Sequence, residues 1–164
     1  MSGKAHTYPV TVTWTGNTGE GTTTYRAYRR DHEISVDGKP VIPASSDPAF
    51  RGDPARYNPE ELFVASLSQC HMLWYLHLCA DNGVNVVAYV DRAEGVMAED
   101  ASGSGRFTRV TLRPGITLAP GSDAALADTL HHAAHEMCFI ARSVSVPVAV
   151  EATYLVEDPA LTPS

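Results

Sequence analysis

The longest apolar stretch of the chain predicts a core helix. Residues 62–80 contain no Asp, Glu, Lys or Arg, and this length approaches that of a membrane-spanning segment. Polar residues such as Ser66, Gln69 and His77 interrupt the stretch, and no basic flank follows it. We therefore expect a buried helix of a globular protein rather than a transmembrane one. Because this helix is apolar nearly all the way round, other elements or a second subunit must enclose it.

The residues before this stretch predict where the helix begins. Asn58 is a good N-cap, and Pro59 suits the first helical position. Glu60 and Glu61 favour the positive end of the helix dipole, and Glu61 is placed to close a capping box with Asn58. An Asn-Gly pair follows the apolar stretch and should stop the helix. The expected bounds are residues 58–82.

Alternating and amphipathic patterns predict the remaining elements. Three strands are expected within residues 8–36, at 8–14, 22–30 and 32–36, followed by a proline-rich surface loop over 37–57. Two long strands are expected within 84–118, at 84–99 and 105–118, then a second helix over 122–141 and a final strand over 144–156. This order predicts an α+β fold with a mainly antiparallel sheet packed around two helices. A chain of 164 residues favours a single domain over 1–164.

The second predicted helix carries two sets of residues with helical spacing. His131, His135 and Cys138 are spaced i, i+4 and i+7, so they share one face. We interpret this face as the solvent-facing side of an amphipathic helix. A zinc site on the same three residues is the alternative, although no paired-cysteine motif supports it. The apolar stripe consists of Leu126, Leu130, Ala133, Met137 and Ile140.

Composition excludes several classes of partner. The formal net charge is −7 and hydrophobic residues make up 44% of the chain. An acidic chain is a poor match for nucleic acid, whose backbone needs a basic patch, and for an anionic membrane surface. Residues 1–10 contain no apolar segment of the signal-peptide type. We therefore expect a cytoplasmic protein that binds neither nucleic acid nor membranes.

Two cysteines, Cys70 and Cys138, lie far apart in apolar helix-like segments. In a reducing compartment such a pair is more typical of chemistry or metal binding than of a structural disulfide. The apolar helix around Cys70 raises a thiol pKa, so a reactive Cys70 needs an arginine from another segment. A simply buried structural cysteine is the alternative. Cys79 lies nine positions beyond Cys70, about 13 Å along a helix, and the two cannot form a disulfide.

The two cysteine segments resemble those of a known family. The stretch Asn58-Pro59-Glu60-Glu61-Leu62, with a cysteine ten residues after Glu60, is similar to the signature of the OsmC/Ohr family of organic hydroperoxide reductases. Cys138 followed by Arg142 resembles the second cysteine segment of that family. The resemblance extends over about residues 8–156, and the long loop before the first helix is closer to the OsmC branch.

The resemblance implies a function for each cysteine. Members of the family are thiol peroxidases that use no metal, haem or flavin cofactor. Cys70 matches the peroxidatic cysteine, which attacks an organic hydroperoxide and becomes a sulfenic acid. Cys138 matches the resolving cysteine, which condenses with that sulfenic acid to a disulfide. An external dithiol, typically a lipoyl group on a protein, then restores the thiols.

The resemblance also implies two charged site residues. Glu60 matches the family's glutamate, and Arg51 best matches the arginine that supports the thiolate, with Arg56 and Arg26 as alternatives. Glu60 and Cys70 lie about 15 Å apart along a continuous helix, so they cannot both contact one peroxide from the same straight helix. Either the helix is broken or Glu60 comes from a second subunit, and we expect an intertwined homodimer. A non-enzymatic stress-related ligand-binding protein on the same fold is the competing hypothesis.

Overall fold

A continuous helix, α1 (Pro59–Asp81), begins at the capping contacts that the sequence predicts. The Asn58 side chain accepts a hydrogen bond from the Glu61 backbone N–H (2.8 Å), and the Glu61 carboxylate accepts one from the Asn58 backbone N–H (3.2 Å). This reciprocal pair is a capping box, which satisfies two donors that the helix start would leave unpaired. Past the helix end, Gly83 has a positive φ of 72°, which glycine adopts at little steric cost. The helix predicted over 58–82 is confirmed.

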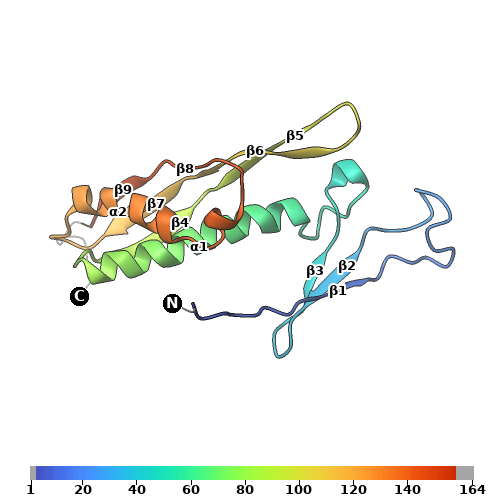
Figure 1. Ribbon diagram of the computed structural model, residues 1–164, viewed down its shortest axis with the longest axis horizontal. Helices are drawn as coiled ribbons and strands as arrows, with labels where there is room; N and C mark the ends of the chain where they lie inside the picture. Colours follow the sequence, from blue (N-terminus) through green and yellow to red (C-terminus); the bar gives the residue numbers. More distant parts are fainter. Residues whose placement is uncertain (1–2, 158–164) are drawn as a thin grey trace. The chain divides into compact units, whose positions relative to one another are not determined.

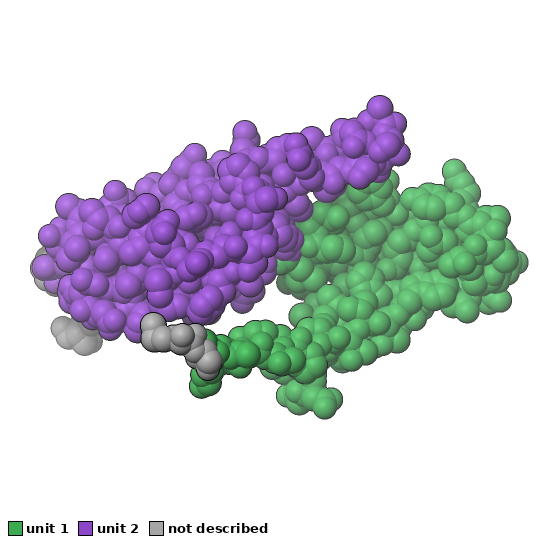
Figure 2. Space-filling model, in the orientation of Figure 1, with its two compact units in different colours: residues 1–62 green, residues 63–164 purple. Residues whose placement is uncertain are grey.

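The computed structural model describes residues 3–157 and comprises two compact units, residues 1–62 (unit 1) and residues 63–164 (unit 2) (Figure 2). The chain passes from unit 1 to unit 2 within the first turns of α1. A single domain over 1–164 stays a prediction. No helix in the described part of the chain has both the length and the hydropathy that crossing a bilayer requires.

Unit 1 contains a three-stranded antiparallel sheet in the order β1-β2-β3 (Figure 1). β3 falls within residues 37–57, which the sequence predicts as a loop, and a short 3₁₀ helix follows it. β3 is an edge strand, and an edge tolerates a residue such as Pro43 that has no backbone donor. The elements are β1 (Thr11–Trp14), β2 (His32–Ser35), β3 (Ile42–Ala44) and the 3₁₀ helix Pro48–Phe50.

The strand predicted over residues 22–30 is wrong, because local contacts hold this segment in turns. The Arg30 guanidinium donates to the backbone carbonyls of Tyr28 (2.6 Å) and Tyr25 (2.7 Å). It also lies over both rings, 4.1 Å from the centre of Tyr28 and 4.2 Å from that of Tyr25. These cation–π contacts and hydrogen bonds occupy carbonyls that strand pairing would otherwise use.

Unit 2 contains two three-stranded sheets, in the orders β4-β7-β9 and β5-β6-β8 (Figure 1). The pairs β4–β7 and β5–β6 are antiparallel, whereas β7–β9 and β6–β8 are parallel. The α+β class predicted from the sequence is confirmed, with mixed rather than purely antiparallel sheets. The strands are β4 (Val86–Asp91), β5 (Glu94–Glu99), β6 (Gly105–Leu112), β7 (Pro114–Leu118), β8 (Val148–Val150) and β9 (Thr153–Val156).

The long strands predicted over 84–99, 105–118 and 144–156 are each divided into two shorter strands. Asp91 lies at this division, where its Oδ1 accepts a hydrogen bond from the Arg113 backbone N–H (2.6 Å) and its Oδ2 accepts one from the Ser68 hydroxyl of α1. The chain therefore changes from one sheet to the other at a point that is tied to α1.

The core of unit 2 forms along α1. Toward its C-terminal end, Tyr75 and Cys79 pack against Ile116 and Leu118 of β7 and against Leu130 of the second helix. Closer to the N-terminal end, a second cluster joins α1 to β6 through Leu67, Val110 and Leu112. The fully buried residues of α1 follow one i, i+4 stripe: Leu67, His71, Tyr75 and Cys79.

The second helix, α2 (Ala124–Met137), is shorter than the predicted 122–141. It begins at Asp123, whose carboxylate accepts hydrogen bonds from two backbone N–H groups of the first turn. It ends because Cys138 adopts extended backbone angles (φ −69°, ψ 109°), and a short 3₁₀ helix, Ala141–Ser143, follows. Cys138 is therefore a helix-end residue rather than a mid-helix one.

Candidate active site

The two cysteines predicted to act together lie near each other in unit 2. Cys70 is half-buried in the middle of α1, and Cys138 is 1% exposed at the end of α2. Both are free thiols, and Cys70 lies close enough to Cys138 to raise the pKa of its thiol. Residues 68 positions apart in the sequence thus place two thiols near each other, one on a half-buried residue and one on a buried residue.

The surroundings of Cys138 keep it protonated at neutral pH. Burial and then the nearby Cys70 side chain raise the pKa of the Cys138 thiol to about 11. The Ala141 backbone N–H, 3.3 Å from the Cys138 sulfur, acts in the opposite direction but is outweighed.

Two buried histidines lie beside the cysteine pair. His71, the residue after Cys70, and His131 of α2 are joined by a 2.9 Å hydrogen bond between His71 Nε2 and His131 Nδ1. Burial lowers the pKa of each imidazole to about 4. His131 also stacks on Tyr75, with ring centres 4.0 Å apart. Both rings are therefore neutral at pH 7 and belong to the core.

This pair corrects the interpretation of α2. His131 and Cys138 are buried and His135 is half-buried, so the face they share points inward rather than to solvent, while His132 is exposed. Nor do they gather around a metal: among residues 3–157, no three His, Cys, Asp or Glu side chains lie close enough to hold one ion. The zinc hypothesis therefore finds no support in the arrangement of these side chains.

Aromatic residues border the cysteine pair. Trp74 of α1 and Phe139, the neighbour of Cys138, make an edge-to-face contact with ring centres 5.7 Å apart. Leu73, Trp74 and His77 line a mainly apolar depression of about 290 Å³ on the same helix as Cys70. Leu73 and Trp74 lie three and four residues after Cys70, on the adjacent turn. An apolar surface therefore begins one turn from the Cys70 thiol.

The charged residues predicted for the site, Arg51 and Glu60, lie in unit 1 and the cysteines in unit 2. Arg51 follows the 3₁₀ helix with a left-handed φ of 67°, and its guanidinium lies 6.0 Å from the Tyr25 ring centre. Within the described residues Arg51 has no carboxylate partner, whereas Arg56 lies 3.7 Å from Asp53. The Oε2 atom of Glu60 is buried and has no hydrogen-bond partner in that same part of the chain.

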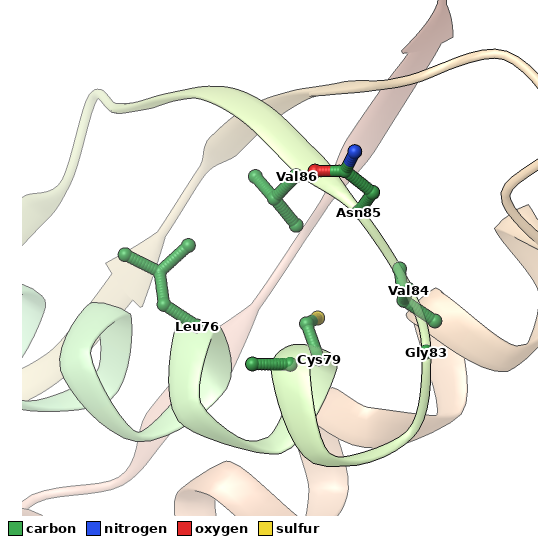
Figure 3. Close-up of a pocket in the computed structure, with 7 residues that line it drawn as sticks. Leu76, Cys79, Gly83, Val84, Asn85 and Val86 are labelled. Carbon is green, nitrogen blue, oxygen red and sulfur yellow. The ribbon is translucent and has the colours of Figure 1, made fainter.

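Cys79 belongs to a different place. It lines a pocket of about 420 Å³ between the end of α1 and the start of β4, together with Leu76, Asn85 and Val86. In Figure 3 its side chain points from the helix toward the strand that carries Val86. Burial raises the pKa of this thiol, as expected for an unreactive core cysteine.

Comparisons with solved structures define the fold class first. An OsmC-like protein of unknown function from Vibrio cholerae superimposes with a TM-score of 0.81 and 35% identity, over 91% of this chain and 100% of that one. The organic hydroperoxide resistance protein OhrB of Bacillus subtilis superimposes with a TM-score of 0.60 and 22% identity, over 89% of this chain and 98% of that one. An organic hydroperoxide resistance protein from Elizabethkingia anophelis superimposes with a TM-score of 0.64 and 19% identity, over 94% of this chain and 100% of that one.

Sequence comparison then gives the family. The model of the OsmC-like protein family matches residues 52–153, which include both Cys70 and Cys138. The chain belongs to the OsmC-like protein family, as the two cysteine segments predict. No curated protein matches the chain.

Sequence reasoning missed the link between His71 and His131. The signal was present in the i, i+4 spacing of Leu67, His71, Tyr75 and Cys79, which is the spacing of a buried helix face. Because the other faces of α1 are also apolar, the sequence pattern did not single out this face as the buried one.

Proposed function

We propose that this protein is a thiol peroxidase that reduces organic hydroperoxides to alcohols. The proximity of the free thiols of Cys70 and Cys138 carries the proposal. Two cysteines that already lie near each other are placed to form a disulfide, which is the oxidised form expected of such an enzyme. The names of the Bacillus subtilis and Elizabethkingia anophelis proteins refer to organic hydroperoxide resistance, which supports the same chemistry.

The environments of the two thiols give them different functions. Cys70 is only half-buried, so we expect a peroxide to reach its sulfur. Cys138 is buried and has a pKa raised to about 11, so it is a poor first nucleophile. We therefore take Cys70 as the attacking thiolate and Cys138 as the resolving thiol.

The reaction balances with these two thiols and one dithiol. The Cys70 thiolate attacks one peroxide oxygen, the O–O bond breaks, and the alkoxide takes up a proton to leave as an alcohol. Cys138 then attacks the Cys70 sulfenic acid, and water leaves as the disulfide forms. An external dithiol, for which a lipoylated protein is our candidate, returns two electrons and two protons. The proposed steps use only these thiols and need no metal or organic cofactor.

Arg51 and Glu60 complete the proposed site. An arginine beside Cys70 would favour its thiolate and stabilise the negative charge that develops on the departing oxygen. The unpaired Oε2 of Glu60 supports a role in holding that guanidinium, because a buried carboxylate oxygen without a partner is costly. Arg51, which lacks a carboxylate partner among the described residues, remains our first choice over Arg56.

The apolar depression beside Cys70 favours an organic substrate. Its lining by Leu73 and Trp74 suits an alkyl or aryl group, whereas hydrogen peroxide would gain nothing from it.

One equivalent of cumene hydroperoxide is expected to consume two thiols per chain, because the first oxidation at Cys70 is followed by disulfide formation. Thiol titration measures the loss, and peptide mapping should find a bond between Cys70 and Cys138 while Cys79 remains a thiol. Three thiols that survive the treatment would contradict the proposal and favour the non-enzymatic ligand-binding protein.

The position of Glu60 also supports a homodimer. α1 is unbroken from Pro59 to Asp81, which removes a broken helix as the way for Glu60 and Cys70 to reach the same peroxide. About 15 Å of helix separates them, so we propose that the Glu60 beside each Cys70 comes from a second copy of the chain. Sedimentation at micromolar concentration should show a dimer.

Mixing two inactive variants is expected to restore activity if the site is shared. Glu60→Gln removes the carboxylate and Cys70→Ser the nucleophile, but a hybrid dimer carries one site with both intact. Random exchange of subunits should recover about a quarter of wild-type activity, from one intact site in half of the dimers. The control is each variant incubated alone, which should stay inactive. No recovery, in a mixture where mass spectrometry shows hybrids, would place both residues in one chain.

A further inference from the structure

The hydrogen bond between His71 and His131 joins two helices that otherwise meet through aliphatic and aromatic side chains. His71 is 1% and His131 7% exposed, and their rings lie nearly parallel, 8° apart, with centres separated by 5.2 Å. Tyr75 stacks on His131, and Trp74 meets Phe139 just beyond the end of α2. Stacked and edge-to-face rings tolerate sliding, whereas a hydrogen bond fixes direction and distance.

Neither imidazole ring has a second hydrogen-bond partner among the described residues. His71 Nδ1 and His131 Nε2 are buried and make no hydrogen bond within the described residues. Each imidazole therefore depends on the other for its one hydrogen bond, and breaking that bond would leave buried polar atoms unpaired. The pair should hold its geometry firmly.

The two histidines lie on the same two segments as the two cysteines. His71 directly follows Cys70 on α1, and His131 lies seven residues before Cys138, on the same face of α2. A shift of α2 along α1 that broke the histidine contact would also move Cys138 away from Cys70. The position of the resolving thiol is therefore coupled to the histidine pair.

We propose that the His71–His131 hydrogen bond positions α2 so that Cys138 lies near Cys70, and thereby favours closure of the disulfide between them. His71 and His131 are positioning residues in this role, since they act through the cysteines. The inference rests on the proposed function for its physiological purpose, but disulfide closure is measurable without any peroxide.

The test is thiol–disulfide exchange with oxidised dithiothreitol. The two protein thiols give two electrons and two protons to the reagent's disulfide, which yields the Cys70–Cys138 disulfide and reduced dithiothreitol. His131→Leu should lower this equilibrium constant by about tenfold or more, because misplaced groups lose much of their effective concentration. His131→Asn keeps a polar atom near the position of Nδ1 and should stay within about threefold of the wild type.

A second pair of variants makes the same comparison from α1. His71→Gln places a polar atom near Nε2 and should preserve the equilibrium constant, whereas His71→Leu should lower it as His131→Leu does. The exposed His132 supplies the matched control, because it lies on the same helix and His132→Leu leaves the His71–His131 pair intact. Circular dichroism identifies the variants that fold. The comparison at His131 or the comparison at His71 is sufficient for the test.

Equal equilibrium constants for the folded leucine variants and the wild type would overturn the inference. A fall of the same size in the Asn and Leu variants would also overturn it, since loss of packing alone would explain that result. A wild-type protein that closes the disulfide yet does not reduce cumene hydroperoxide would remove the proposed function and leave this inference standing.

Discussion

Replacing Cys70 with serine will lower the rate of cumene hydroperoxide reduction by about a thousandfold or more, because a neutral hydroxyl is a far weaker nucleophile than a thiolate. The rate is measured as peroxide consumed in the presence of excess dithiol. Cys79→Ser is the matched control, since it removes a buried thiol from the same helix that lies away from the pair. It should change the rate little.

The Cys138→Ser variant separates attack from resolution. It should consume one equivalent of hydroperoxide and stop at a sulfenic acid on Cys70, which dimedone labels and mass spectrometry detects. Wild-type rates in Cys70→Ser, or a dimedone adduct on Cys138 in the wild type, would contradict the functions given to the two thiols.

The sequence is informative where local chemistry decides the structure. The start of α1 was predicted correctly because Asn58 and Glu61 form their capping contacts within a few residues. The strand predicted over 22–30 was wrong because the β-branched and aromatic residues of this segment fit a strand as well as they fit the turns that it forms. What decides that segment is the Arg30 side chain, which bonds two carbonyls and covers two rings.

Tertiary contacts explain the other differences. Residues 144–156 form two strands because their partners, β6 and β7, separate at Arg113 and join different sheets. No pattern within residues 144–156 contains that information. The end of α2 likewise depends on the backbone of Cys138, where the chain leaves the helix beside the tertiary neighbour Cys70.

The candidate site divides in the same way. The cysteine pair was predictable because the residues around each thiol resemble a family, but the inward direction of the His131 face was not. In α1 nearly every face is apolar, so sequence periodicity does not show which residues are buried. In α2 the sequence pattern places the histidines on a polar face. Burial of His131, however, lowers its pKa so far that it is a neutral core residue.

The folded protein will lose several kcal/mol of stability as the pH falls from about 6.5 to about 4, and much of this loss will come from the two buried histidines. Burial, with a smaller contribution from His135 to His71 and from His71 to His131, lowers the pKa of each of the two buried histidines to about 4. Asp91 acts on His71, and Asp128 on His131, in the opposite direction, without reversing the shift. In the unfolded chain a histidine has a pKa of about 6.5.

The sign follows from where protons bind. Between pH 6.5 and 4 the unfolded chain takes up protons on these histidines and the folded protein does not, so acid favours unfolding. Stability from this source is fully present above about pH 6.5 and falls by up to roughly 1.4 kcal/mol per histidine per pH unit below it. Typical domains have only about 5–15 kcal/mol in total, so the effect is large enough to unfold the protein.

Urea unfolding at a series of pH values, followed by circular dichroism, measures this dependence. The double variant His71→Gln/His131→Asn replaces both titrating rings with neutral amides, and its stability should change much less over the same interval. Carboxylates titrate in both proteins, so the difference between the two curves isolates the histidines. His77→Gln/His132→Gln, which changes two exposed histidines, should follow the wild type. Parallel curves for the wild type and the buried-pair variant would mean that the imidazoles are not shielded from protons in the folded state, and the neutral pair between α1 and α2 would have to be abandoned.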